Sequence, residues 1–344
     1  MLDAFFTWYE NLPGTLIGAL ALFAVGLVLL IKGGDWFVDS ATAIAKRFRV
    51  PEIIIGATVV SIGTTLPEVM VSATAAMNQN GAIAYGNAIG SIICNTALIA
   101  ALTIAIRPAP VNRKAITMPV IFFFVSAAIY LVAAYGFGRF DRWLGIVMLA
   151  VFALYMTLTV RQGFKNPVTA DAHAQEDTTS SDGSLLLSFA VLVGSAILIA
   201  IGADMLESSS VSLAGMAGIP TEVVGVTIVA LCTSLPELVT AVTALAKGHG
   251  ALSLGNIIGA NIFNLVLVSG VAVTISPFEV PTGSTLFGQN TSLVLELPLM
   301  LAVMALMTLP AVFKKKLFRW QGAALLTIYA AFVLIQVLIA LHIL

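Results

Sequence analysis

The sequence predicts an all-α polytopic membrane protein with ten transmembrane helices in two inverted five-helix repeats, of which helices 2 and 7 are broken. Three observations predict this architecture. Hydrophobic residues make up 59% of the 344 residues and charged residues only 10%, whereas soluble domains carry roughly a quarter charged residues. The pattern TTLPE, ending at Glu68, returns as TSLPE, ending at Glu237, 169 residues later. One clearly polar stretch lies between the two patterns.

The helices follow from the apolar runs, counted at about 20 residues per span. The predicted segments are 12–33, 36–78, 84–106, 115–136, 141–162, 184–203, 205–246, 251–275, 290–312 and 318–342. The second and seventh are too long for one straight helix, and each contains a TxLPE pattern. Because proline removes a helical hydrogen bond and clashes with the preceding turn, we expect both helices to be broken there. At membrane depth such breaks must face protein or a wet cavity.

The polar stretch 163–183 predicts a linker of low hydrophobicity between a first repeat, 1–162, and a second repeat, 184–344. Aligning 51–95 with 220–264 without a gap gives 18 identical residues in 45 positions. The identities include prolines, glutamates and asparagines, which a shared hydrophobic composition alone does not align. We interpret the match as an internal duplication.

Charge placement predicts the orientation. Five helices per repeat is an odd number, so the second repeat enters the membrane from the opposite side. Lys46, Arg47 and Arg49 correspond in the second repeat to uncharged residues. The positive-inside rule therefore places the connections after odd-numbered helices, and the central linker, in the cytoplasm, and both termini outside the cell (inner) membrane; only Arg139 and Arg142 oppose this. Inverted repeats with paired broken helices are typical of secondary transporters, whose substrate site lies near the midplane.

The two glutamates are the first candidate functional residues, because a carboxylate at membrane depth is costly and indicates function. Thr64 precedes Glu68 by four residues, and Thr233 precedes Glu237 by four. Residues four apart share a helix face. Each TxLPE pattern therefore presents a hydroxyl and a carboxylate together.

A polar stripe follows on the next helix of each repeat. Its members are Asn87, Ser91 and Asn95 in the first repeat, and Asn256, Ala260 and Asn264 in the second. Asn87 and Asn256 are expected to form hydrogen bonds between helices, which is a common role for membrane asparagines. Three further acidic residues are expected to serve as helix caps or interfacial groups: Asp35, Asp204 and Glu296.

All these candidate ligands are oxygens. Ca²⁺ takes about six to eight oxygen ligands, whereas zinc and copper favour nitrogen and sulfur. Two ionised glutamates neutralise one Ca²⁺, and the same oxygens suit several monovalent ions. Cys94 and Cys232 lie in apolar runs, so no disulfide is expected. The net charge of −1 argues against nucleic acid. The expected partners are the transported ions and the lipid bilayer, with no cofactor and no obligate protein partner.

At these residues the chain resembles a known family. GATVVSIGTTLPE with GNAIGSIICN, and GVTIVALCTSLPE with GNIIGANIFN, are similar to the paired repeats of the cation/calcium exchanger superfamily, and most of all to its prokaryotic sodium/calcium exchanger branch. The early GGDWFV and the RWQG before the last helix extend the resemblance over nearly the whole chain. The resemblance implies ten helices, ion sites between the repeats, and alternating access in which helices one and six slide past the rest.

The resemblance also implies roles for individual residues. Glu68 and Glu237 would bind Ca²⁺ and Na⁺ in turn, with oxygens from Thr64 and Thr233 beside them. Further ligands implied by the resemblance are Thr65, Ser234, Ser91, Asn95 and Asn264.

Three positions depart from the pattern. Ala260 lacks the hydroxyl of Ser91, which would weaken one outlying Na⁺ site. Asn264 stands where some relatives carry Asp, which argues against K⁺ dependence. Cys232 replaces the glycine found at Gly63, so we expect the second break to differ in backbone shape from the first.

The sequence therefore predicts a Na⁺/Ca²⁺ antiporter and not an enzyme. An antiporter of the same fold that uses H⁺ as the coupling ion remains an alternative. An intramembrane hydrolase needs a nucleophile with a base, or a metal with histidine ligands, and the relevant helices contain no histidine. A channel is favoured less, because channels commonly build a filter from a ring of subunits.

Overall fold

The computed structural model describes residues 14–108, 111–165, 185–217, 230–341 and 343. In this part of the chain, nine helices are long and apolar enough to cross a membrane, and Leu235–Ala246 is a shorter apolar helix. The described helices therefore agree with the ten-helix prediction, the shorter one belonging to the seventh span. The predicted linker falls mostly on 166–184, outside the described residues, so the domain boundaries stay a prediction.

The first repeat consists of helices, several of them containing π-helical segments (η), and one short strand. Its elements are α2 (Leu16–Phe48), α3 (Glu52–Ile55), η2 (Gly56–Val60), α4 (Ser61–Met77), α5 (Gly81–Cys94), η3 (Asn95–Ala100), α6 (Ala101–Ile106), α7 (Arg113–Leu131), η4 (Val132–Phe137), β1 (Arg139–Phe140) and α8 (Arg142–Lys165).

The second repeat follows the same order of helices and adds two short hairpin strands. Its elements are α9 (Leu185–Met216), α11 (Ala230–Thr233), α12 (Leu235–Ala246), α13 (Gly250–Phe263), η7 (Asn264–Val268), α14 (Ser269–Ile275), β2 (Phe278–Glu279), β3 (Thr285–Leu286), β4 (Gln289–Asn290), η8 (Ser292–Glu296), α15 (Leu297–Lys314) and α16 (Arg319–Ala340).

Two predicted boundaries are wrong at matched places. The first helix continues through Gly33 and Asp35 to Phe48, and the sixth continues through Gly202 to Met216. The glycines do not end these helices because they allow close packing: a Cβ on Gly33 would lie 2.9 Å from Ile199 Cγ1 on α9, and one on Gly202 would lie 2.8 Å from the carbonyl oxygen of Gly26 on α2. The motif GGDWFV thus marks a helix crossing.

The prediction of a break at Pro67 in the second span is wrong, because this proline lies inside α4. Its irregularity is the π-helical segment η2, one turn before TTLPE. Pro67 still has no N–H to donate to the carbonyl of Gly63, four residues earlier. The seventh span does break as predicted, because α11 ends at Thr233 and Ser234 leaves the helical region (φ −93°, ψ 8°) before α12 begins.

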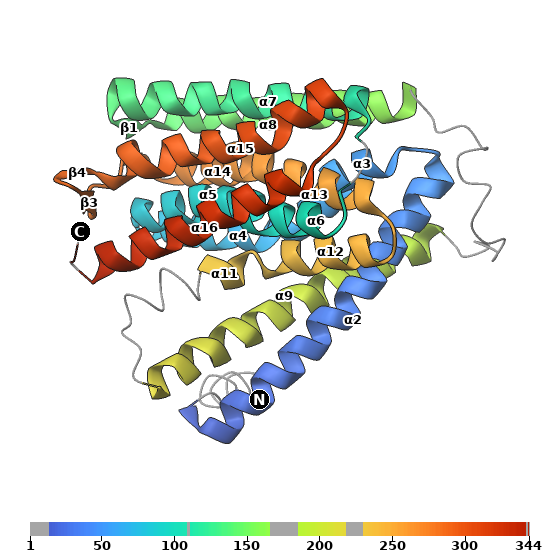
Figure 1. Ribbon diagram of the computed structural model, residues 1–344, viewed down its shortest axis with the longest axis horizontal. Helices are drawn as coiled ribbons and strands as arrows, with labels where there is room; N and C mark the ends of the chain where they lie inside the picture. The colour runs from blue at the N-terminus through green and yellow to red at the C-terminus, as the bar shows by residue number, and fades with distance from the viewer. Residues whose placement is uncertain (1–13, 109–110, 166–184, 218–229, 342, 344) are drawn as a thin grey trace.

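The connections gather at two ends of the bundle (Figure 1). At one end the backbone N–H of Val111 donates to the carbonyl of Lys315 at 2.9 Å. At the other end β1 pairs with β2 in antiparallel register. The connection after the third span thus meets the one after the ninth, and the connection after the fourth span meets the one after the eighth. Matched connections of the two repeats therefore lie at opposite ends, as an inverted repeat requires.

Basic residues lie overwhelmingly at the first of these ends. Among the described residues, only Arg139 and Arg142 lie at the end that carries the strands. Arg139 forms an ion pair with Asp141. Arg142 donates to the carbonyls of Thr274 and Ile275 at 2.9 and 3.2 Å, where it caps the end of α14. Both exceptions to the charge rule thus have local partners.

Helices α2 and α9 form a distinct pair. Figure 1 shows them side by side and oblique to the remaining helices, which run roughly parallel to one another. Their extensive mutual packing includes the crossing at Gly26, Gly33 and Gly202. The other helices enclose the ion-site candidates, so the core of the protein lies in the larger bundle.

The RWQG motif joins the last two helices. Gln321 Oε1 accepts a hydrogen bond from the N–H of Phe318 at 2.8 Å, and its Nε2 donates to the carbonyl of Leu306 at 2.8 Å. A Cβ on Gly322 would lie 2.6 Å from the carbonyl oxygen of Ala101. This motif therefore has a structural role in starting α16 and seating it on α6.

Candidate ion-binding site

The two glutamates lie inside the larger bundle, on α4 and α12, and both are fully buried. Glu68 follows Pro67 within α4, where the carbonyl of Gly63 lacks its usual helical donor. Glu237 lies in the first turn of α12, just after Ser234 and Pro236. The positive end of a helix favours a carboxylate at that position.

Each glutamate-bearing helix packs against a π-helical segment of the opposite repeat. Helix α4 contacts η7, and α12 contacts η3. The two π segments begin at Asn95 and Asn264, which are matched positions 169 residues apart. π-helical segments inside α-helices frequently mark functional sites. Both repeats therefore contribute a carboxylate helix and an asparagine helix to one central region.

The predicted ligands carry a group of buried polar atoms without hydrogen-bond partners in the described chain. These atoms are Oε1 and Oε2 of Glu68, Oε2 of Glu237, Oγ of Ser234, and both amide atoms of Asn95 and Asn264. All five residues are fully buried. A buried polar atom without a partner costs free energy, and five of the predicted ligands carry such atoms.

The neighbouring hydroxyls connect the two repeats. Thr65 Oγ1 donates to Glu237 Oε1 at 3.4 Å, and Thr64 Oγ1 donates to Asn256 Oδ1 at 3.3 Å. Both threonines are buried. The structure thus places a TTLPE hydroxyl of the first repeat on the TSLPE carboxylate of the second.

Asn87 and Asn256 have the structural surroundings expected of them. Asn87 Nδ2 donates to Ser72 Oγ at 2.8 Å and to the carbonyl of Glu68 at 3.1 Å. Asn256 Nδ2 donates to Thr240 Oγ1 at 3.0 Å, and its backbone carbonyl accepts from Ser61 Oγ at 2.9 Å. These bonds hold the backbone beside Glu68 and link α13 to η2 and α4.

Ser61 and Thr240 are residues that the sequence reasoning did not single out. Their matched positions hold Ala230 and Val71, so the internal repeat hides their polar roles. The signal available was that each is a hydroxyl within one or two helical turns of a glutamate.

Ser91 and Thr233 lie at a cavity of about 440 Å³ that also reaches Glu296 and Gln336. Gln336 Nε2 donates to Glu296 Oε1 at 3.0 Å. Glu296 closes η8 directly after the β3–β4 hairpin, so the cavity runs from two predicted ligands toward the end of the bundle that carries the strands. The interfacial placement expected for Glu296 is consistent with this.

The matched glycines of α5 and α13 have different surroundings. A Cβ on Gly259 of α13 would lie 2.7 Å from Ala57 Cα, whereas Gly86 and Gly90 of α5 have no heavy atom within 4 Å of an added Cβ. The two α5 glycines line the cavity. Ala260, fully buried beside Gly259, offers no hydroxyl, so this part of the site is unequal in the two repeats.

Asp35, which is expected to be a helix cap or an interfacial group, caps no helix end. It lies in the middle of α2, where its carboxylate is 3.4 Å from Lys247 Nζ. Lys247 follows α12, and the two residues belong to different repeats. The described residues contain no group of three or more His, Cys, Asp and Glu side chains that could hold a metal. Glu68 and Glu237 are the charged groups among the predicted ligands, and the other predicted ligands are neutral.

A family model described as sodium/calcium exchanger protein matches residues 18–161 and 187–338. The chain belongs to the sodium/calcium exchanger family. The two matched stretches correspond to the two repeats, and together they cover most of the sequence.

Relatives of the exchanger chain agree with this membership. The sodium/calcium exchanger MaX1 of Methanosarcina acetivorans is 31% identical over 91% of this chain and 97% of its own length. An uncharacterized membrane protein of Methanocaldococcus jannaschii is 34% identical over 91% of this chain and 96% of its own. The inner membrane protein YrbG of Escherichia coli is 35% identical over 76% of this chain and 81% of its own.

Solved exchanger structures have the same fold. The sodium-calcium exchanger NCX_Mj, soaked with 2.5 mM Na⁺ and 0.1 mM Ca²⁺, aligns with a TM-score of 0.75 and 31% identity, covering 92% of this chain and 98% of that one. The ten-helix architecture predicted from the sequence is therefore confirmed.

Proposed function

We propose that this exchanger is an antiporter that moves Ca²⁺ against Na⁺ by alternating access, with its ions bound between the two repeats. The observation that carries the proposal is the group of unpartnered buried atoms on Glu68, Glu237, Ser234, Asn95 and Asn264. Their carboxylate, hydroxyl and amide oxygens are the ligand types that Ca²⁺ prefers. They come from both repeats, so an ion held by all of them is gripped from both halves.

Competition for the two carboxylates supplies the coupling. Ca²⁺ brings two positive charges to Glu68 and Glu237, and Na⁺ ions occupying the same oxygens supply comparable neutralisation. Either load removes the cost of two buried negative charges, which is large at low dielectric. The site thus favours reorientation when one of the two loads is present and opposes simultaneous occupation by both. The ions are substrates, and no covalent step is required.

The ligand assignment includes four hydroxyls besides the unpartnered group. Thr64 and Thr233 precede the glutamates by four residues, Thr65 contacts Glu237, and Ser91 lines the cavity. We assign all of them, with the five residues above, to ion binding. Asn264 in place of a carboxylate keeps the charge at two, which fits transport without K⁺.

The cell (inner) membrane is the proposed location, with the end that carries the basic residues in the cytoplasm. The concentration of Lys and Arg at that end and the local partners of Arg139 and Arg142 support this orientation. It places both termini and the β3–β4 hairpin outside, and the central linker inside.

Uptake of Ca²⁺ into vesicles containing the purified protein tests the proposal. Vesicles loaded with Na⁺ and diluted into Na⁺-free buffer should accumulate Ca²⁺, and vesicles with only a pH gradient should not. Adding K⁺ to either face should leave the rate unchanged. Uptake driven by the pH gradient alone would replace Na⁺ coupling with H⁺ coupling, and currents without ion exchange would indicate a channel.

A further inference from the structure

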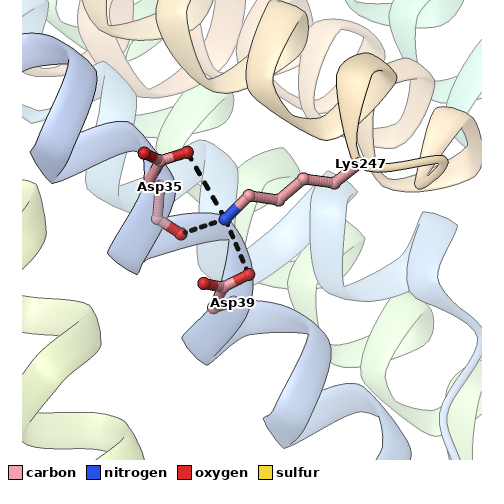
Figure 2. Close-up of polar contacts among 3 residues, drawn as sticks. All are labelled: Asp35, Asp39 and Lys247. Atoms are coloured by element: carbon pink, nitrogen blue, oxygen red, sulfur yellow. Dashed lines mark hydrogen bonds and ion pairs between the residues drawn. The ribbon is translucent and has the colours of Figure 1, made fainter. Parts of the chain in front are cut away.

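Lys247 joins the α12–α13 turn to helix α2 through three oxygens. Its Nζ lies 2.8 Å from Asp39 Oδ1, 3.4 Å from Asp35 Oδ1 and 3.0 Å from the carbonyl oxygen of Asp35 (Figure 2). The lysine side chain is 28% exposed. We call Lys247, Asp35 and Asp39 the Lys247 cluster.

Apart from this cluster, helix α2 also packs closely against α12 at Gly34. A Cβ on Gly34 of α2 would lie 2.5 Å from Val239 Cγ1 and 3.2 Å from Thr243 Oγ1 of α12. Helix α2 packs much more extensively against α9 than against α12. The α2–α9 pair is therefore a unit of its own, and the Lys247 cluster is an ionic contact between this pair and the larger bundle.

The lysine of the cluster has no charged residue at its matched position in the first repeat. Shifted by 169 residues, Lys247 corresponds to Asn78 and Asp39 to Ser208, while Asp35 corresponds to Asp204. Asn78 ends α4 as Lys247 ends α12, but it carries no charge. An ionic contact of this kind is thus encoded at one end of an otherwise matched pair of repeats.

In an inverted-repeat carrier, the two orientations arise when the halves exchange conformations around the shared site. An ion pair whose lysine is matched by the uncharged Asn78 cannot re-form in the other repeat by that exchange. We propose that the Lys247 cluster stabilises one orientation of the carrier by holding α2 against the α12–α13 turn. This inference rests on the proposed antiporter function, because it requires that the carrier reorients.

The orientation is the one open toward the strand end of the bundle. The cavity that contains Ser91 and Thr233 leads to Glu296, next to the β3–β4 hairpin. The α12–α13 turn lies at the opposite end of α12 from the break at Ser234, which borders Thr233 at the cavity. The Lys247 cluster therefore holds the end opposite the cavity closed, and with the proposed membrane orientation this is the outward-facing state.

Apparent Ca²⁺ affinity on each face of the membrane tests the inference, because a shift between orientations moves the two affinities in opposite directions. In oriented vesicles, Lys247→Gln should raise the half-saturating Ca²⁺ concentration on the outer face and lower it on the inner face. Each change should be about two- to five-fold, the size expected of a partly exposed ion pair. The charge exchange D39K with K247D should restore both values toward those of the unmodified protein.

Arg139→Gln is the matched control. It breaks an ion pair with Asp141 at the strand end without detaching α2 from anything, so it should move neither affinity. Equal shifts on both faces, or no shift in K247Q with normal folding, would overturn the inference while Na⁺-driven uptake by the unmodified protein upholds the proposed function. If K247Q does not fold, the double variant D39K with K247D decides. Ca²⁺ affinities on both faces equal to those of the unmodified protein support the role of the Lys247 cluster, and shifts of both affinities in the same direction contradict it.

Discussion

Glu68 and Glu237 occupy matched positions in the two repeats, and their surroundings differ. Glu237 Oε1 accepts a hydrogen bond from Thr65, whereas neither oxygen of Glu68 has a partner in the described chain. Ser234, the counterpart of Thr65, likewise makes no hydrogen bond through its hydroxyl. One carboxylate thus accepts a hydrogen bond from the other repeat, and the other carboxylate has no hydrogen-bond partner in the described chain.

This difference separates two levels of symmetry in the molecule. The ion ligands are duplicated: threonine, proline, glutamate and asparagine recur at the same spacing. The contacts that hold them are not, as the hydrogen bonds of Thr65 and the Lys247 cluster demonstrate. Two-fold ligands allow one ion to be bound from either face, and one-sided contacts make the two orientations unequal in energy.

The largest expected effect is the loss of either carboxylate. Glu68→Gln and Glu237→Gln should each weaken Ca²⁺ binding by more than about a hundredfold, because the attraction between a divalent ion and a buried carboxylate amounts to several kcal/mol. Isothermal titration with Ca²⁺ and vesicle uptake measure the effect. Glu279→Gln, an exposed carboxylate in β2, is the control and should bind Ca²⁺ normally.

The comparison between the two glutamates makes a finer statement about the same variants. Since Glu68 has no hydrogen bond to lose, E68Q should leave the unfolding temperature of the ion-free protein unchanged or raise it, by removing an unpartnered charge. Normal transport by both variants would remove the two-carboxylate site from the account altogether.

A smaller effect is expected at the position where the repeats differ by one hydroxyl. Ser91→Ala makes the first repeat equal to the second at Ala260, and it should raise the half-saturating Na⁺ concentration by roughly three- to ten-fold, the usual cost of one lost ligand hydrogen-bond group. Ca²⁺ affinity should change less, since the carboxylates dominate it. Na⁺ dependence of Ca²⁺ efflux measures both.

Ser253→Ala controls for the loss of a buried serine hydroxyl. Ser253 is buried on α13 but belongs to the opposite end of that helix from Asn264, so its removal should leave Na⁺ dependence unchanged. A Ca²⁺ loss in S91A as large as its Na⁺ loss would contradict the assignment of Ser91 to a site used mainly by Na⁺.

Much of the fold was predictable because the apolar runs mark the membrane spans and the internal repeat marks the two matched halves. The helix boundaries near Gly33 and Gly202 were not, since glycine and aspartate in sequence look alike whether they end a helix or form a crossing. The crossing depends on α9 lying against α2, a contact between residues about 170 positions apart. The sequence also did not show that α4 continues through Pro67. The irregular backbone lies about one turn before TTLPE, in η2, where no proline marks it.

The site was predictable where duplication marked it. The two glutamates, Asn95 and Asn264 stand at repeated positions in apolar surroundings, and the structure gathers their helices at one place. Ser61, Thr240 and Lys247 are absent from the pattern because each occurs in one repeat only, opposite Ala230, Val71 and Asn78. A method that searches for symmetry therefore finds the ion ligands and overlooks the residues that make the two halves differ.

The smallest effect tests the asymmetry between Thr65 and Ser234. In the ion-free protein, Thr65→Ala removes the hydrogen bond to Glu237 and should lower the free energy of unfolding by about 1 kcal/mol or less, since the bond is long at 3.4 Å. Ser234→Ala removes a hydroxyl without a protein partner and should not lower it. Thermal unfolding in detergent with and without Ca²⁺ measures the difference. With Ca²⁺ present both variants should lose part of the ion's stabilisation, because both hydroxyls are assigned to the ion.

Thr65→Ser, which keeps the hydroxyl and matches the second repeat, is the control. Equal stability of T65A and S234A without ions would mean that the two carboxylates are supported alike, and the asymmetry would then lie in the Lys247 cluster alone.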